Sequence, residues 1–80
     1  MQELLKQTVT ARTESHSDVA DTTPARAYQA ATTERQFGEV LLRRVREARG
    51  EITVRGFREE WLPMDGGLIH ELSVEVIASE

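Results

Sequence analysis

Two histidines are the side chains of this 80-residue sequence best suited to acid–base chemistry. His16 stands between Ser15 and Ser17 in a polar segment, and His70 stands in an alternating run near the C-terminal end. Neither has a second ligand at metal spacing, since no HxxxH or HExxH pattern occurs. A serine next to a histidine becomes a nucleophile only when a rigid scaffold holds both. We therefore expect both histidines to be ordinary surface residues, and we predict neither a catalytic nor a metal-ligating residue.

Paired carboxylates and glycines do not indicate an active site either. Glu59 and Glu60 are neighbours, and neighbouring residues of a strand point to opposite faces, so they are not expected to share a substrate. Gly66 and Gly67 follow Asp65 in a hairpin rather than in the strand-to-helix turn of a phosphate loop. The sequence therefore predicts a non-enzymatic protein without a cofactor.

A basic block is the first feature that could bind a ligand. The net charge is −2 over residues 1–42, +4 over residues 43–58 and −6 over residues 59–80, which together give −4. The overall acidity disfavours a general nucleic-acid binder. The dipole of a helix favours cations at its C-terminal end, which accounts for much of this block. An anion-binding patch is the alternative, and its residues would be Arg43, Arg44, Arg46, Arg49, Arg55 and Arg58.

Three apolar residues could form a protein-binding surface. Phe57 and Trp61 lie near a turn, where Trp61 is either part of the core or an interface anchor. Ile77 is expected on the outer face of the last strand, where a second subunit could cover it.

One amphipathic helix is predicted over residues 24–50. Thr23 is expected as the N-cap with Pro24 at the first helical position, although Thr33 and Gln36 form a second candidate capping box. Gly50 is expected to take the left-handed conformation that ends the helix. Spacings of three and four predict an apolar stripe, interrupted by Glu34, that comprises Ala27, Ala30, Ala31, Phe37, Leu41, Val45 and Ala48.

Three strands complete the expected fold. Residues 4–12 alternate well enough for a strand, with a short helix over residues 2–7 as the alternative, and residues 13–23 read as a flexible acidic loop. Residues 51–61 and 68–78 form a hairpin, with Asp65 and Gly66 in its turn. Gly56 stands where the alternation changes parity, which indicates a bulge. The inner face of the last strand is expected to carry Leu72, Val74, Val76 and Ala78.

These elements predict a single α+β domain over residues 1–80, in the order β-α-β-β, with one helix packed on a small antiparallel sheet. A domain this small, without cysteines and with two open sheet edges, commonly gains stability by self-association, so we expect a homo-oligomer. No signal peptide or membrane span is predicted, and a cytoplasmic location is the default expectation.

The β-α-β-β order, with residues 65–79 (DGGLIHELSVEVIAS) as an Asp-Gly turn before a long final strand, resembles the architecture of dodecins. The resemblance covers about residues 37–79 and implies an oligomer and, as an alternative function, a small-ligand carrier that binds a flavin. Dodecins carry the flavin-stacking tryptophan early in the second strand, where this chain has residues 52–54, so no flavin-binding residue is assigned.

The leading functional expectation is an acidic protein–protein interaction module. It could act as a homo-oligomer, as a subunit of a larger assembly, or as an inhibitor, an immunity-type protein or a phage-encoded host-interaction protein. Flavin binding and nucleic-acid contact through the basic block are the alternatives.

Overall fold

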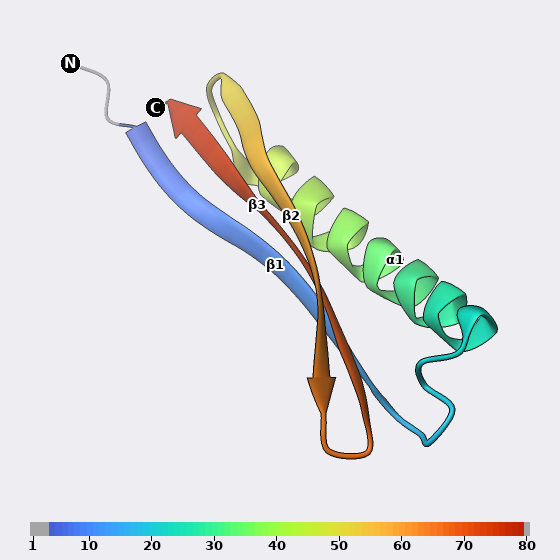
Figure 1. The fold of residues 1–80 in the computed structure, drawn as a ribbon. Coiled ribbons are helices and arrows are strands. Elements are labelled where there is room, and N and C mark those ends of the chain that lie inside the picture. Colours follow the sequence, from blue (N-terminus) through green and yellow to red (C-terminus); the bar gives the residue numbers. More distant parts are fainter. Residues whose placement is uncertain (1–3, 80) are drawn as a thin grey trace.

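The computed structural model describes residues 4–79 and shows one helix packed on a three-stranded antiparallel sheet (Figure 1). The elements follow the chain as β1 (Leu4–His16), α1 (Thr23–Glu47), β2 (Ile52–Met64) and β3 (Gly67–Ser79). The molecule is elongated, with extents of 53 × 18 × 15 Å. Both ends of the described chain lie at the end of the sheet where α1 finishes, and the β2–β3 turn lies at the opposite end. The predicted α+β class and element order are confirmed.

The sheet has the strand order β1-β3-β2, so the last strand of the chain is its centre. β1 pairs with β3 from Leu4↔Ser79 to His16↔Gly67, and β2 pairs with β3 from Ile52↔Ala78 to Met64↔Gly67. β1 and β2 are therefore the two edges of the sheet.

The core lies between α1 and one face of the sheet. Val9, Val74 and Val76 are buried there, and Leu72 of β3 is buried on the same face. Four half-buried side chains pack against this cluster, namely Phe37, Val40, Leu41 and Ile52. The inner face predicted for β3 is thus confirmed at Leu72, Val74 and Val76.

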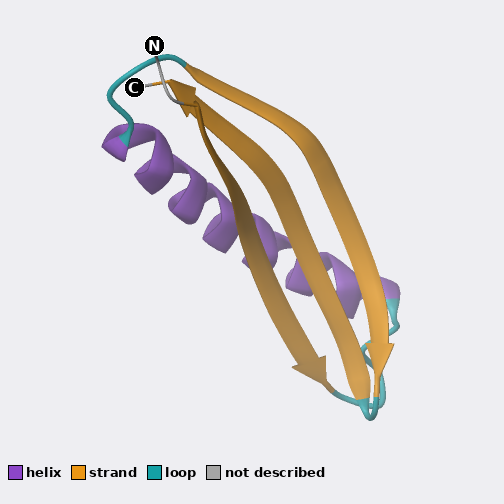
Figure 2. Ribbon diagram, turned by 90° about the vertical axis from the view of Figure 1, so that its left-hand side faces the viewer, coloured by secondary structure: helices purple, strands orange, loops and turns teal. Residues whose placement is uncertain are grey.

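The helix covers β1 and β3 but reaches β2 only marginally. Figure 2 shows α1 running along one face of the sheet at an angle to the strands. As a consequence, the helix-side face of β2 is left partly open: Val54, which pairs with the buried Val76, is itself 47% exposed.

A bulge interrupts β2 where the sequence predicts it. The register shifts between Arg55, which pairs with Glu75, and Arg58, which pairs with Ser73. Gly56 has a φ of 71°, in the left-handed region that glycine adopts without steric cost. Phe57 comes directly after this glycine, and its ring makes an edge contact with Phe37 of α1.

The ends of the helix differ from the prediction. Thr22 rather than Thr23 is the N-cap residue, and its hydroxyl donates to the carbonyl of Val19 instead of capping the helix. At the other end, α1 stops at Glu47, because Ala48 takes an extended backbone that leads the chain toward β2. Gly50 has no positive φ, so its expected role as a left-handed cap is wrong.

The face that α1 turns to the sheet also differs. Ala27, Ala31 and Val45 of the predicted stripe are exposed, whereas Gln29 and Thr33 are buried. Small alanines gain little from burial, so they hold a helix face in place only weakly. The hydrogen bonds of Gln29 and Thr33, described below, instead determine which face of α1 is turned toward the sheet.

The loops are shorter than expected. β1 continues to His16, four residues into the segment predicted as an acidic loop, and α1 begins at Thr23. Pro63 does not end β2, which runs to Met64 before a two-residue turn of Asp65 and Gly66. A proline is tolerated there because β2 is an edge strand. No helix within residues 4–79 is both long and apolar enough to cross a membrane.

Candidate functional site

A buried polar network joins α1 to the sheet and is centred on His70 of β3. His70 is fully buried, so its predicted position at the surface is wrong. The reason is its place in the strand: it shares its face with Leu72, Val74 and Val76, and this face lies under α1. Thr33 of α1, also fully buried, lies opposite, with its Oγ1 2.7 Å from Nδ1 of His70.

The other side of the imidazole ring is bonded to a carboxylate of β2. Nε2 of His70 lies 2.9 Å from Oε2 of Glu59. Glu59 reaches the histidine because, after the bulge, it pairs with Leu72 on the helix side of the sheet. Glu60 points away and accepts a 2.8 Å hydrogen bond from Arg58. The two neighbouring carboxylates do lie on opposite faces, as predicted, and only one of them belongs to this network.

Thr33 has more neighbours than its single hydroxyl hydrogen can serve. Its Oγ1 lies 2.6 Å from Oγ1 of Thr13, 2.7 Å from Nδ1 of His70 and 3.0 Å from the Gln29 carbonyl, which can only accept. If Thr33 donates to that carbonyl, His70 must donate from Nδ1, and it becomes a cation when Nε2 also donates to Glu59. If His70 is neutral with its hydrogen on Nε2, Thr33 turns its hydrogen toward Nδ1. The two arrangements therefore differ in the rotation of one hydroxyl group and in one hydrogen on Nδ1 of His70.

The side chain of Gln29 extends the network to the backbone of the sheet. Its Nε2 donates to the carbonyl of Leu68 at 3.0 Å and to that of Thr13 at 3.2 Å. Gln29 thereby joins the first turns of α1 to both β3 and β1. These bonds, together with those of Thr33, fix which face of the helix meets the sheet.

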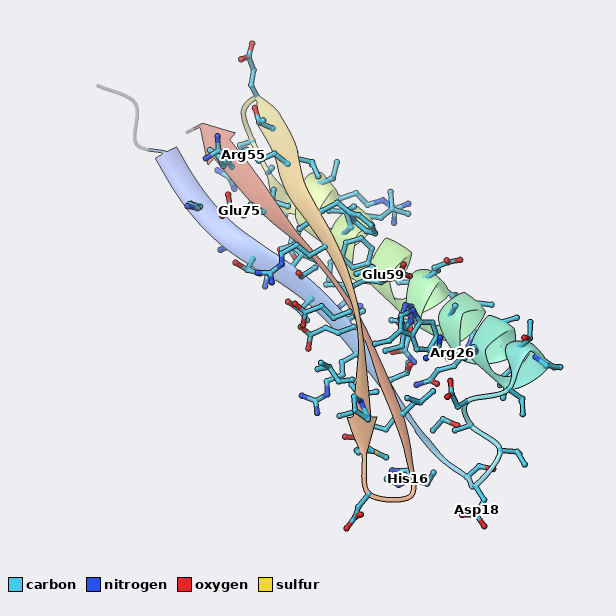
Figure 3. All side chains as sticks on the ribbon, viewed as in Figure 1. His16, Asp18, Arg26, Arg55, Glu59 and Glu75 are labelled. Atoms are coloured by element: carbon cyan, nitrogen blue, oxygen red, sulfur yellow. The ribbon has the colours of Figure 1, made fainter. Side chains whose placement is uncertain are left out.

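Trp61 and Arg26 cover the network on the β2 side. The ring of Trp61 stacks on that of His70, with centroids 4.0 Å apart and an angle of 26° between the planes. The guanidinium carbon of Arg26 lies 4.9 Å from the centre of the Trp61 ring, a distance typical of a cation–π contact. Nε of Arg26 is also 2.8 Å from Oδ1 of Asp21, as an ion pair without hydrogen-bond geometry. Figure 3 shows Arg26 and Glu59 on the helix side of β2.

A hydroxyl, an imidazole and a carboxylate in hydrogen-bond contact are the groups that activate a nucleophile in many hydrolases. In this conformation the geometry does not allow Thr33 to attack a substrate, because its hydroxyl is fully buried and surrounded by its own partners. Glu59 is the member open to solvent, with a side chain that is 45% exposed. Within residues 4–79, His, Asp and Glu side chains form no group of three or more that could hold a metal ion.

The arginines of the predicted anion site are divided between two faces. Arg43, Arg44, Arg46 and Arg49 belong to the end of α1 and the segment after it, on the helix side of the sheet. Arg55 and Arg58 project from the opposite face: Arg55 pairs in register with Glu75, whose neighbours Val74 and Val76 face the helix. Figure 3 shows Arg55 and Glu75 near the end of the sheet that holds the termini. The structure therefore does not bring the six arginines into one patch.

The residues of the predicted protein-binding surface lie in three different settings. Phe57 is 63% exposed on the helix side of β2, and Trp61 is half-buried against His70. Ile77 is half-buried on the outer face of β3. Leu62, which the sequence does not single out, is 39% exposed on the outer face of β2, where it pairs with Ile69.

One edge strand therefore carries three exposed apolar side chains, those of Val54, Phe57 and Leu62. We call these three residues the β2 strip. Val54 and Phe57 face the helix side and Leu62 faces the other side, so the strip occupies both faces of β2.

No family model, curated protein or solved structure gives a significant match to this chain.

Proposed function

We propose that this protein is a protein-binding module that engages its partner along β2. The single observation that supports this proposal is the exposure of Val54, Phe57 and Leu62 on one edge strand. Exposed apolar side chains are common individually, but three on the same edge strand give a partner apolar contacts on both faces of that strand. As an edge strand, β2 also has backbone donors and acceptors without a strand partner among residues 4–79, and a second chain can use them by extending the sheet.

The setting of Phe57 supports its role as the anchor of this surface. Its ring contacts Phe37 at a centroid distance of 6.3 Å and yet remains mostly open to solvent. An aromatic side chain with one face held and the other free can bind a partner without losing much conformational freedom. Trp61, four residues further along, is already stacked on His70 and would form the less mobile side of the contact.

Affinity capture with matched variants tests the proposal. Wild-type protein and a Phe57→Ser variant are immobilised, and bound proteins are identified by mass spectrometry. We expect at least one specific partner, including the protein itself, whose capture falls at least about tenfold with Phe57→Ser. Tyr28→Ser is the control, because Tyr28 is an aromatic residue of α1 that is 78% exposed but lies outside the β2 strip. Equal capture by wild type and Phe57→Ser would contradict the proposal.

A further inference from the structure

The distribution of charge along β2 points to a specific occupant of this edge. The basic block of the sequence ends at Arg58 and the acidic block begins at Glu59, so the change of sign falls in the middle of the strand. On the outer face, Arg55 and Arg58 lie in the first half of β2 and Glu60 lies in the second half. A strand charged in this way is complementary to itself when two copies run antiparallel.

The apolar residues favour pairing at the edge over packing on one face. A partner that covered only the helix side would leave Leu62 exposed, and one that covered only the outer face would leave Val54 and Phe57 exposed. A strand placed beside β2 adjoins both faces at once. Edge pairing also uses the backbone groups of β2 that have no strand partner within residues 4–79.

The other edge of the sheet is less suited to such pairing. The exposed side chains of β1 include Lys6, Thr8, Thr10 and Arg12, whereas its apolar residues Val9 and Ala11 are buried. β1 therefore offers a second copy less exposed apolar surface than β2 does.

We infer that two copies of this chain associate through β2, antiparallel and side by side, about a two-fold axis near Glu59. In this arrangement Arg58 of one copy lies next to Glu60 of the other, and the reciprocal pair forms on the far side of the axis. Each residue of the β2 strip then gains a neighbour from the other copy, since Phe57 lies next to Trp61, Val54 next to Pro63 and Leu62 next to Arg55. Glu59 lies close to the axis, but in each copy its carboxylate is held by its own His70. This inference rests on the proposed function and names a second copy of the chain as the partner.

Charge reversal at Arg58 and Glu60 tests the inference. Both side chains are exposed, and each is the other's partner within the chain, so a single reversal changes two reciprocal contacts of the pair of copies. Arg58→Glu brings acids together across the axis, and Glu60→Arg brings arginines together. We expect each variant alone to weaken self-association at least about tenfold. An equimolar mixture of the two variants should restore it, because each acid then meets an arginine.

Sedimentation equilibrium over a concentration series measures the association, and circular dichroism confirms that each variant is folded. Two further proteins complete the set. The double variant Arg58→Glu with Glu60→Arg should associate like wild type, and Arg35→Glu, at an exposed position of α1, should have no effect. Wild-type protein that stays monomeric at every concentration, or association that survives both single reversals, would overturn the inference.

Orientation is tested separately with introduced thiols, since the chain has no cysteine of its own. Because of the bulge, the position symmetric to Thr53 about Glu59 is Met64: Thr53 pairs with Ile77 and Met64 with Gly67, each five positions from Leu72, which pairs with Glu59. The antiparallel arrangement therefore places Thr53 of one copy close to Met64 of the other. Mixed Thr53→Cys and Met64→Cys proteins should form a mixed disulfide on oxidation. A disulfide between two Thr53→Cys chains instead would show parallel strands and overturn the inference.

The outcomes also separate this inference from the proposed function. A monomeric chain that captures a different protein in a Phe57-dependent manner would overturn the self-pairing and leave the protein-binding module standing. Loss of both self-association and Phe57-dependent capture would overturn both.

Discussion

Thr33 and His70 are separated by 37 positions in the sequence, yet Oγ1 of the first lies 2.7 Å from Nδ1 of the second. This contact joins the middle of α1 to the central strand, and both side chains are fully buried. A buried polar pair contributes little net stability when it is intact, but loss of one partner leaves the other without a hydrogen bond. The network therefore determines how the helix sits on the sheet more than it determines how stable the fold is.

The first prediction concerns the hydroxyl of Thr33. Thr33→Val keeps the shape of the side chain but leaves Nδ1 of His70 and the hydroxyl of Thr13 without their partner. We expect the free energy of unfolding to fall by about 1–3 kcal/mol, measured by urea denaturation. Thr32→Val is the control, because the hydroxyl of Thr32 donates to the backbone carbonyl of Tyr28 at the exposed side of the same helix. If the two variants lose equal stability, the His70 contact is not what makes Thr33 important.

The second prediction compares two neighbouring carboxylates. Glu59→Gln replaces a charged partner of a buried imidazole with a neutral one, and we expect a loss of about 1 kcal/mol in unfolding free energy. Glu60→Gln removes an exposed ion pair with Arg58 and should change stability by less than about 0.5 kcal/mol. Thermal denaturation followed by circular dichroism measures both. A larger effect at Glu60 would contradict the assignment of Glu59 to the network.

The third prediction concerns two glycines in opposite situations. A Cβ at Gly67 would clash with the carbonyl oxygen of Ser15, a backbone atom that cannot move without disturbing the pairing of β1 with β3. Gly67→Ala should therefore destabilise the fold strongly or prevent folding. Gly38 lies inside α1 with nothing within 4 Å of such a Cβ, so Gly38→Ala should raise the free energy of unfolding by about 1 kcal/mol. A destabilising Gly38→Ala would indicate that a partner packs closely against this part of the helix.

The fourth prediction concerns acid. A hydrogen bond from Lys6 holds the pKa of Glu75 below its usual value, desolvation opposes this effect, and Arg55 adds to the lowering. A carboxyl group with a lowered pKa in the folded state stabilises the fold above its ordinary pKa, and this contribution is lost as the pH falls through the folded value. Wild type should therefore be more stable than Glu75→Gln at neutral pH, and the difference should shrink in acid. Unfolding curves across a pH series, with Glu34→Gln as the control, measure the effect; a difference independent of pH would contradict it.

The fifth prediction concerns the core. Val74 is buried beside Val9 and Val76, and an aspartate there would bring a carboxylate under the helix without a partner. Val74→Asp should abolish the native circular dichroism spectrum. Ser73→Asp changes the next residue, on the outer face, and should leave the protein folded. A folded Val74→Asp protein would contradict the assignment of the inner face.

Much of the fold could be predicted because alternation and turn residues act locally. The parity of Leu72, Val74 and Val76, the bulge at Gly56 and the turn at Asp65 and Gly66 all follow from a few neighbouring residues, and the structure shows each of them. The end of α1 was beyond this reasoning, because the extended backbone of Ala48 follows from where β2 must begin.

The buried network was missed for a different reason. Gln29 and Thr33 are polar, and a search for apolar stripes passes over them, although they precede Phe37 and Leu41 at regular steps of four. His70 shares the parity of the inner residues of β3, and this signal was present in the sequence but was outweighed by the usual exposure of histidine. Only the long-range pairing of helix and sheet shows that these residues are one another's partners.

The bulge at Gly56 has a consequence for any change in the length of β2. Deletion of Gly56 would place Phe57 opposite Val74 and make the ladder regular from Arg55 and Glu75 to Arg58 and Ser73, with every later pair of β2 unchanged. If the bulge straightened with Gly56 retained, Glu60 would instead meet His70 and Trp61 would pair with Ile69, so that Trp61 would turn to the outer face. The bulge thus absorbs the one residue by which β2 exceeds β3 in this region, and by doing so it keeps Glu59 and Trp61 on the helix side of the sheet.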